Sequence, residues 1–213
     1  MESKKCLEQV ASVFSGRPAK PILRLRHFAV LALFTEIDEE LHLVLNKRAA
    51  GVLQPGDICF PGGHREDHET LEETALRETE EELGILRQEI QILGKSDYML
   101  TVYRGLIQPF LGYVPYDTFL QARPNPMEVD KIFTVPLSFF LETTPESFDM
   151  VWKAVEVSDF PYERIEGGKN YPFRKSVFPE LFYEYDGYTI WGLTAQIIQN
   201  IVETLKIAEI PQN

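Results

Sequence analysis

Apolar and polar positions along the chain follow the repeats of a mixed α/β protein. Residues 27–35 (HFAVLALFT) form a continuous apolar run, which is typical of a strand buried on both faces. Residues 41–46 form a second strand, and the acidic stretch between the two predicts a long antiparallel hairpin. Residues 1–15 place apolar side chains among polar ones and end at Gly16, which predicts a short amphipathic helix.

Further strands and helices are predicted after this hairpin. Strands are expected at residues 58–60, 88–98, 105–114 and 131–135, with one or two more in 148–160. Pro136 opens a short helix, Asp186 and Gly187 turn between strands 177–185 and 188–190, and residues 191–207 form the closing helix. The pattern predicts a single domain over residues 1–213, with an N-terminal helix and linker at 1–20 and a loop insertion at 161–174.

A glycine turn leads into a helix crowded with glutamates over residues 61–85, PGGHREDHETLEETALRETEEELGI. At roughly 100° per residue around the helix, Glu73 and Glu80 lie opposite the apolar face and are expected to face water. Glu78, Glu81 and Glu82 lie along the edges of the buried face. Like charges one turn apart destabilise a helix by about 0.2–0.5 kcal/mol per pair. A cation is therefore expected beside them, and carboxylate oxygens suit Mg²⁺.

Composition agrees with a soluble, cytoplasmic domain. The chain has 213 residues, of which 44% are hydrophobic, so one sizeable core can form. A formal net charge of −12 repels nucleic acid polymers and anionic membranes. Two cysteines, Cys6 and Cys59, do not make a disulfide framework, and no stretch of 18 apolar residues occurs. Any phosphate substrate would need a local basic patch or a metal ion.

The spacing within residues 61–85 resembles the Nudix box. Gly63 is followed after five residues by Glu69, and after seven more by the run RETEEELGI at 77–85. The one departure is Thr79, which stands where the family has an aliphatic residue and can still pack. The resemblance implies a Nudix fold, an α/β/α sandwich with a mixed central sheet, and a pyrophosphohydrolase that depends on Mg²⁺ or Mn²⁺.

The resemblance also implies roles for the acidic residues. Glu78 and Glu82 would bind the metal ion, and Glu81 would be a third metal ligand or the general base. The backbone carbonyl of Gly62 is another candidate ligand. The general base stays open among Glu81, Glu128 and a further group, so Glu78, Glu81 and Glu128 are the candidate catalytic residues.

Other residues of the same stretch are expected to support the site. Glu69 and Arg77 would form an ion pair that fixes the glycine loop on the helix. His64 and His68 lie close in sequence, but the expected chemistry needs no imidazole.

A second resemblance is to the coenzyme A pyrophosphatases within the Nudix group. Residues 45–63 are similar to their upstream signature LLTxRSxxLRxxxGxVxFPGG, residues 125–137 to a segment NPxEV leading to VPL, and residues 190–195 to an aromatic WGxTA sequence. This resemblance makes Lys47, Arg48, Phe60 and Gly63 candidate substrate-binding residues. Glu128 becomes a loop carboxylate near the site. Lys47 and Arg48 could equally end a solvated strand, and Glu128 could equally stabilise a turn.

The predicted function is metal-dependent hydrolysis of the pyrophosphate of coenzyme A or its thioesters, giving 3′,5′-ADP and 4′-phosphopantetheine or its acylated form. One alternative is a Nudix pyrophosphatase that acts on ADP-ribose, NADH or another nucleoside diphosphate derivative. Another is a Nudix domain that senses nucleotides without catalysis, against which the intact box argues. The expected partner is a small nucleotide-derived molecule, and a homodimer is a further expectation.

Overall fold

The central strand of the fold is the continuous apolar run near the N-terminus. The computed structural model describes residues 2–101 and 105–208. In it this run forms β1 (Arg26–Ile37). Leu31 and Leu33 face one hydrophobic core, whereas Ala32 and Phe34 face a second core on the opposite side. Because successive side chains of a strand point to opposite faces, an unbroken apolar run suits a strand covered on both sides.

A mixed sheet forms around β1. β1 pairs antiparallel with β2 (Glu40–Arg48) and parallel with β7 (Gly105–Tyr113). The strand order is β3-β2-β1-β7-β5, and β4, β6 and β8 pair with β1, β7 and β2 respectively. The bounds of the remaining strands are β3 (Ile58–Cys59), β4 (Gly62–His64), β5 (Gln91–Lys95), β6 (Met99–Leu100) and β8 (Val129–Pro136).

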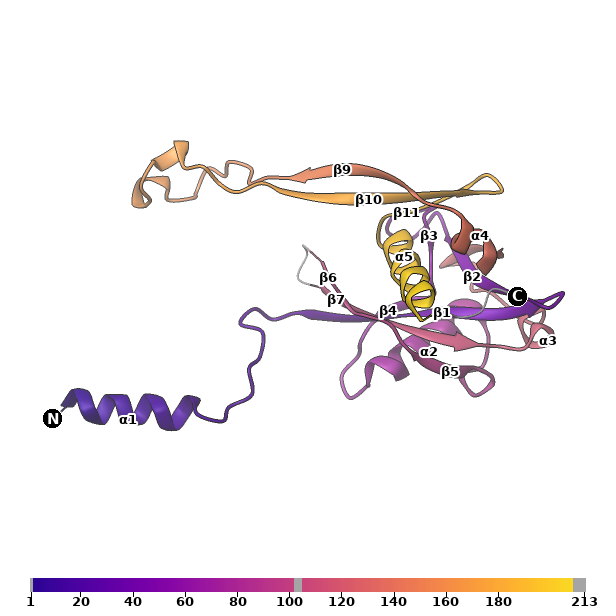
Figure 1. The fold of residues 1–213 in the computed structure, drawn as a ribbon, viewed down its shortest axis with the longest axis horizontal. Helices are drawn as coiled ribbons and strands as arrows, with labels where there is room; N and C mark the ends of the chain where they lie inside the picture. Colours follow the sequence, from indigo (N-terminus) through magenta and orange to yellow (C-terminus); the bar gives the residue numbers. More distant parts are fainter. Residues whose placement is uncertain (1, 102–104, 209–213) are drawn as a thin grey trace.

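Helices cover both faces of this sheet, as Figure 1 shows. α2 (Leu71–Leu83) packs on one face, where Ala75 and Leu83 are fully buried. α4 (Leu137–Glu142) and α5 (Gly192–Ile207) lie on the other, where Phe140 and Ile198 belong to the core. The predicted α/β/α sandwich with a mixed central sheet is confirmed.

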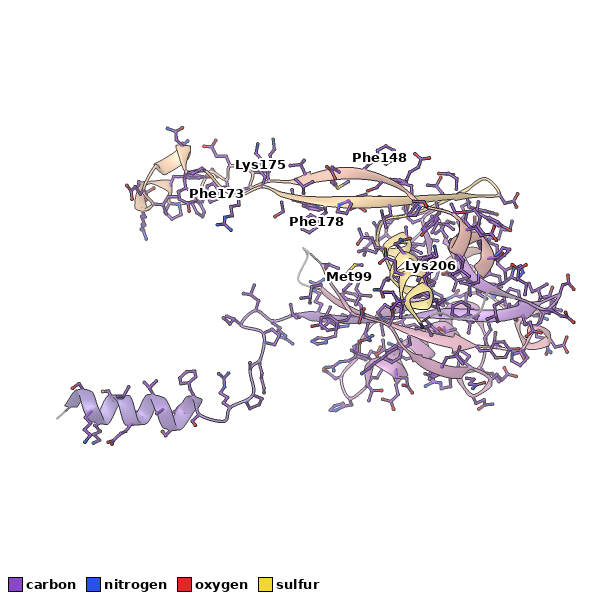
Figure 2. The ribbon with its side chains drawn as sticks, in the orientation of Figure 1. Met99, Phe148, Phe173, Lys175, Phe178 and Lys206 are labelled. Carbon is purple, nitrogen blue, oxygen red and sulfur yellow. The ribbon has the colours of Figure 1, made fainter. Side chains whose placement is uncertain are left out.

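A second, three-stranded sheet extends from the body as a long arm (Figure 1). It consists of β9 (Glu146–Trp152), β10 (Ser176–Tyr185) and β11 (Tyr188–Trp191), all antiparallel. The turn at Asp186 and Gly187 has φ angles of 47° and 77°, as a favoured two-residue hairpin turn requires. Figure 2 shows Phe148 and Phe178 on this arm, and both are exposed.

Several predicted boundaries were wrong. The strand expected within residues 148–160 begins at Glu146 and ends at Trp152. The loop insertion expected at residues 161–174 is not among these errors; it contains two short 3₁₀ turns, Tyr162–Arg164 and Gly168–Asn170, at the far end of the arm (Figure 1). The strand expected from residue 88 starts only at Gln91, because the 3₁₀ turn Arg87–Glu89 precedes it. The short helix α3 (Tyr116–Phe119) was not predicted.

The N-terminal helix is present as α1 (Glu2–Phe14) and leads away from the body in Figure 1. Met1, which the predicted helix includes, lies outside the described residues. The apolar stripe of α1 is exposed, with Leu7 at 69% and Phe14 at 62% of full exposure. Within residues 2–101 and 105–208, no helix is both long and apolar enough to cross a membrane.

Candidate active site

The acidic helix α2 has well-defined ends. Thr70 is its N-cap and forms a capping box with Glu73, and Gly84 ends it in the left-handed conformation at φ 68°. Such caps satisfy backbone groups that have no partner within the helix. Glu73 was predicted only to face water, and the structure gives it a further role in this capping box. Glu80, also expected to face water, forms an ion pair with Arg87.

Arg77 joins α2 to the glycine turn before it. Its Nε lies 2.6 Å from Glu69 Oε1, and its Nη1 lies 2.9 Å from Glu78 Oε1 and 3.2 Å from Glu81 Oε2. Its Nη2 also donates to the backbone carbonyl of His64 at 3.2 Å. We call Arg77 with these four partners the Arg77 cluster. The predicted Glu69–Arg77 ion pair is present, and the cluster ties β4 to the helix.

The two glycines of the turn are needed because neighbouring atoms approach them closely. A β-carbon on Gly62, whose φ is +154°, would collide with the backbone of Ala29 and Val30 in β1. A β-carbon on Gly63 would collide with the carboxylate of Glu78. Absence of a side chain at both positions lets β4 pair with β1 while the helix brings its carboxylates next to the turn.

Three carboxylates and one guanidinium meet in a pocket beside the turn. We call this site the acidic pocket. Its lining residues come from β2 and the following loop, the turn, α2 and the loop before β8: Arg48, Val52, Gly62, Glu78, Glu82 and Glu128. The backbone helps to close the pocket, because the Ala49 amide donates to the carbonyl of Glu128 at 2.9 Å. Thus the pocket gathers residues that lie far apart in the sequence.

Burial in the acidic pocket disfavours the ionised forms of Glu78 and Glu82. Burial, followed by the charges of Glu78 and Glu128, raises the pKa of Glu82 to about 8. Burial also raises the pKa of Glu78, although Arg77 opposes this shift. In contrast, the hydrogen bonds from Arg77 lower the pKa of Glu69 to about 2. Arg77 thus favours the ionised form of Glu69, whereas burial in the pocket favours the protonated form of Glu82.

The donor set fits a hard divalent cation such as Mg²⁺ or Mn²⁺. Carboxylate oxygens are the ligands these ions prefer, and Mg²⁺ usually binds one or two carboxylates with waters and substrate phosphates. Among the described residues, no three Asp, Glu, His or Cys side chains are close enough to enclose a metal ion on their own. A cation held by Glu78 and Glu82 would leave positions for water and phosphate oxygens.

Some predicted site residues lie outside the pocket. Phe60 is only 4% exposed and belongs to the core beneath α5, and Lys47 pairs with Asp130 at 2.9 Å. The Glu81 side chain is 55% exposed and is held by Arg77. His64 and His68 are exposed and do not line the pocket. Of the two adjacent basic residues, only Arg48 lines it.

Asn46 was missed as a site residue. It lies in β2, is only 1% exposed, and its Nδ2 donates to Glu82 Oε2 at 3.1 Å. The available signal was a polar residue at the end of an apolar strand, directly before the two basic residues. Its partner is 36 positions away in sequence, so the strand pattern alone did not reveal the contact.

The fold and the acidic pocket define a class of protein, the Nudix hydrolases, and comparison with known proteins agrees. The NUDIX domain family model matches residues 25–156, more than half of the chain. The chain therefore belongs to the Nudix family, as its glycine turn and acidic helix predict.

Its relatives include proteins named as coenzyme A diphosphatases. An uncharacterized Nudix hydrolase, NudL of Photorhabdus laumondii, is 32% identical over 78% of this chain and 78% of its own. The peroxisomal coenzyme A diphosphatase NUDT7 of Mus musculus is 30% identical over 68% of this chain and 62% of its own. The mitochondrial coenzyme A diphosphatase NUDT8 of Homo sapiens is 30% identical over 70% of this chain and 56% of its own.

A solved structure of a Nudix hydrolase from M. smegmatis, RenU, aligns with 55% of this chain and 74% of its own, at 21% identity and a TM-score of 0.47. Family membership and the relatives above support the predicted class, a Nudix pyrophosphohydrolase.

Proposed function

We propose that this protein hydrolyses the pyrophosphate of coenzyme A or its thioesters in the presence of Mg²⁺ or Mn²⁺. The products are 3′,5′-ADP and 4′-phosphopantetheine or its acylated form. One observation carries the chemistry: Glu78, Glu82 and Glu128 meet Arg48 in one pocket beside a glycine turn. The substrate rests on the resemblance to coenzyme A pyrophosphatases and on the relatives named as coenzyme A diphosphatases.

Negative charge is the main obstacle to this reaction, and the pocket residues address it in different ways. Glu78 and Glu82 would hold a divalent cation, which would supply positive charge where the phosphate oxygens become more negative. Arg48 donates hydrogen bonds to a phosphate oxygen, for which a guanidinium is well shaped. Arg77 keeps Glu78 beside the turn through their 2.9 Å contact.

Water attacks one phosphorus, and the bond from that phosphorus to the bridging oxygen breaks. The proton that the water loses passes to a carboxylate. We assign this role to Glu128, which lines the pocket without belonging to the Arg77 cluster. Glu81 points to Arg77 instead and is mostly exposed, so the alternative of Glu81 as the base is tested below.

A substrate panel tests the proposal. The purified full chain is incubated with coenzyme A, acetyl-coenzyme A, ADP-ribose, NADH and a diadenosine polyphosphate, each with Mg²⁺, with Mn²⁺ or with a chelator. We expect 3′,5′-ADP as a product from the two coenzyme A substrates only when metal is present. Faster cleavage of ADP-ribose or NADH would favour a different pyrophosphatase. Nucleotide binding without cleavage of any compound would favour a sensor.

Location and assembly belong to the proposal as well. A cytoplasmic location agrees with the cysteine content, although two relatives are named as peroxisomal and mitochondrial. The proposed partner is a small nucleotide-derived substrate bound by a single domain, and the homodimer remains an expectation.

A further inference from the structure

Asn46 is a buried polar side chain that the proposed reaction does not use directly. It follows the buried apolar residues Val44 and Leu45 in β2 and is 1% exposed. At this point β2 lies between β3 and β8, with Cys59 and Ile132 as the neighbours of Asn46 across the sheet. A buried amide without hydrogen bonds would cost folding free energy, so the partners of this amide explain why it is tolerated.

Both ends of the Asn46 amide have partners. Its Nδ2 donates to Glu82 Oε2 at 3.1 Å, and its Oδ1 accepts from the Cys59 thiol at 3.6 Å. Burial keeps the thiol protonated and able to donate, since it raises the pKa of Cys59 to about 11. With the Asn46 oxygen accepting from the thiol, the amide N–H group faces Glu82.

Glu82 needs this donor for two physical reasons. The residue is only 7% exposed, and a buried carboxylate is stabilised by a hydrogen bond to the protein. In addition, a bond to Oε2 fixes the rotation of the carboxylate about its last side-chain bond, which otherwise is broad. The neutral amide achieves both without adding a further negative charge to a pocket that already contains Glu78 and Glu128.

We propose that Asn46 is a positioning residue that orients the Glu82 carboxylate for a divalent cation in the acidic pocket. This inference rests on the proposed function, because it takes Glu82 as a metal ligand. Asn46 contacts Glu82, the proposed metal ligand, and is not among the residues that line the acidic pocket. Its loss therefore weakens metal binding, in the way that the loss of outer partners of metal ligands generally does, by about 10- to 100-fold.

The test is a calorimetric titration of the metal-free full chain with Mn²⁺ alone. Asn46→Leu keeps a side chain branched at the same atom but donates no hydrogen bond. We expect its Mn²⁺ affinity to fall about 10- to 100-fold. Thr194→Val is the matched control, since Thr194 Oγ1 donates to the Ile58 carbonyl at 3.0 Å in the neighbouring strand without touching Glu82. The control should lose thermal stability while keeping wild-type Mn²⁺ affinity.

Asn46→Ala provides a second variant if the leucine does not fold, because a smaller side chain avoids overpacking. A folded Asn46 variant with wild-type Mn²⁺ affinity would overturn the positioning role alone. Absence of Mn²⁺ binding in the wild type would overturn the proposed metal site as well. Equal losses of affinity in the Asn46 variants and in Thr194→Val would show a general packing effect and would also contradict the inference.

Discussion

The Arg77 cluster and the acidic pocket both include residues of α2, yet they place glutamate side chains in opposite electrostatic settings. In the cluster, Arg77 lowers the pKa of Glu69 to about 2. In the pocket, burial and neighbouring carboxylates raise the pKa of Glu82 to about 8. Glu78 belongs to both regions. The difference teaches that Glu69 helps to hold the backbone in place through a cation of the chain, whereas the carboxylates of the pocket are proposed to bind a cation from solution.

The largest expected effect is on turnover. Glu82→Gln removes a proposed metal ligand from the pocket, and we expect coenzyme A hydrolysis to fall by about 1,000-fold or more, since metal stabilisation of this chemistry is worth several kcal/mol. Glu80→Gln is the control, because Glu80 lies on the same helix but pairs with Arg87. Initial rates at saturating Mg²⁺ measure both. Full activity in Glu82→Gln would contradict the proposed role of Glu82 as a metal ligand, which distinguishes the acidic pocket from the Arg77 cluster.

A large effect on stability is expected in the Arg77 cluster. The Arg77 side chain is 13% exposed and contacts three carboxylates. Removing one partner of a buried ion pair costs about 3–5 kcal/mol, so Arg77→Gln should destabilise the protein by about 3 kcal/mol in urea unfolding. Activity should fall too, because the glycine turn is no longer tied to the helix. Unchanged stability with lost activity would instead give Arg77 a direct role in the reaction.

The two regions should also respond oppositely to pH. The pKa of Glu69 is lower in the folded state than its usual value of 4.5, so its stabilisation is complete above about 4.5 and is lost as pH falls toward about 2. The pKa of Glu82 is raised from 4.5 to about 8, so ionising it costs stability as pH rises through that window.

Thermal unfolding in a chelator checks this difference. Metal-free Glu82→Gln should unfold at a higher temperature than the wild type near pH 9, with a smaller difference near pH 4. Glu69→Gln should instead lower the unfolding temperature near neutral pH. A Glu82→Gln protein that is less stable than the wild type at high pH would contradict the raised pKa of Glu82.

The smallest effect is expected at Glu81. Its side chain is 55% exposed and pairs with Arg77 at 3.2 Å, and exposed ion pairs contribute about 0–1 kcal/mol. Glu81→Gln should keep activity within about threefold of the wild type, whereas Glu128→Gln should lower it by about 100-fold or more if Glu128 is the base. The reverse order in rate measurements would assign the proton transfer to Glu81.

The sequence predicted well those parts whose signal is local. The apolar run of β1 and the spacing from Gly63 to Ile85 each lie within one continuous stretch of sequence, and they predicted the strand, the turn and the helix that these stretches form. The position of Glu82 near the buried face follows from the helical repeat, and the structure buries it to 7% exposure. These features need no information about distant segments.

Contacts between distant segments were harder to predict. Lys47 and Arg48 are adjacent, but only Arg48 lines the pocket, whereas Lys47 pairs with Asp130, which lies 83 positions away in sequence. The hydrogen bond from Asn46 to Glu82 joins residues from different layers of the fold. The end of β9 at Trp152 depends on pairing with Ser176, which no local pattern contains.

The contrast between the two regions is tested most directly by the thermal stabilisation that Mn²⁺ gives to the wild type, Glu69→Gln and Glu82→Gln. A ligand that binds only the folded state raises its stability, by about 2.7 kcal/mol at 100 times its dissociation constant. We expect Mn²⁺ to stabilise the wild type and Glu69→Gln, and to leave Glu82→Gln almost unchanged. Equal stabilisation of all three proteins would contradict the assignment of the metal ion to the acidic pocket.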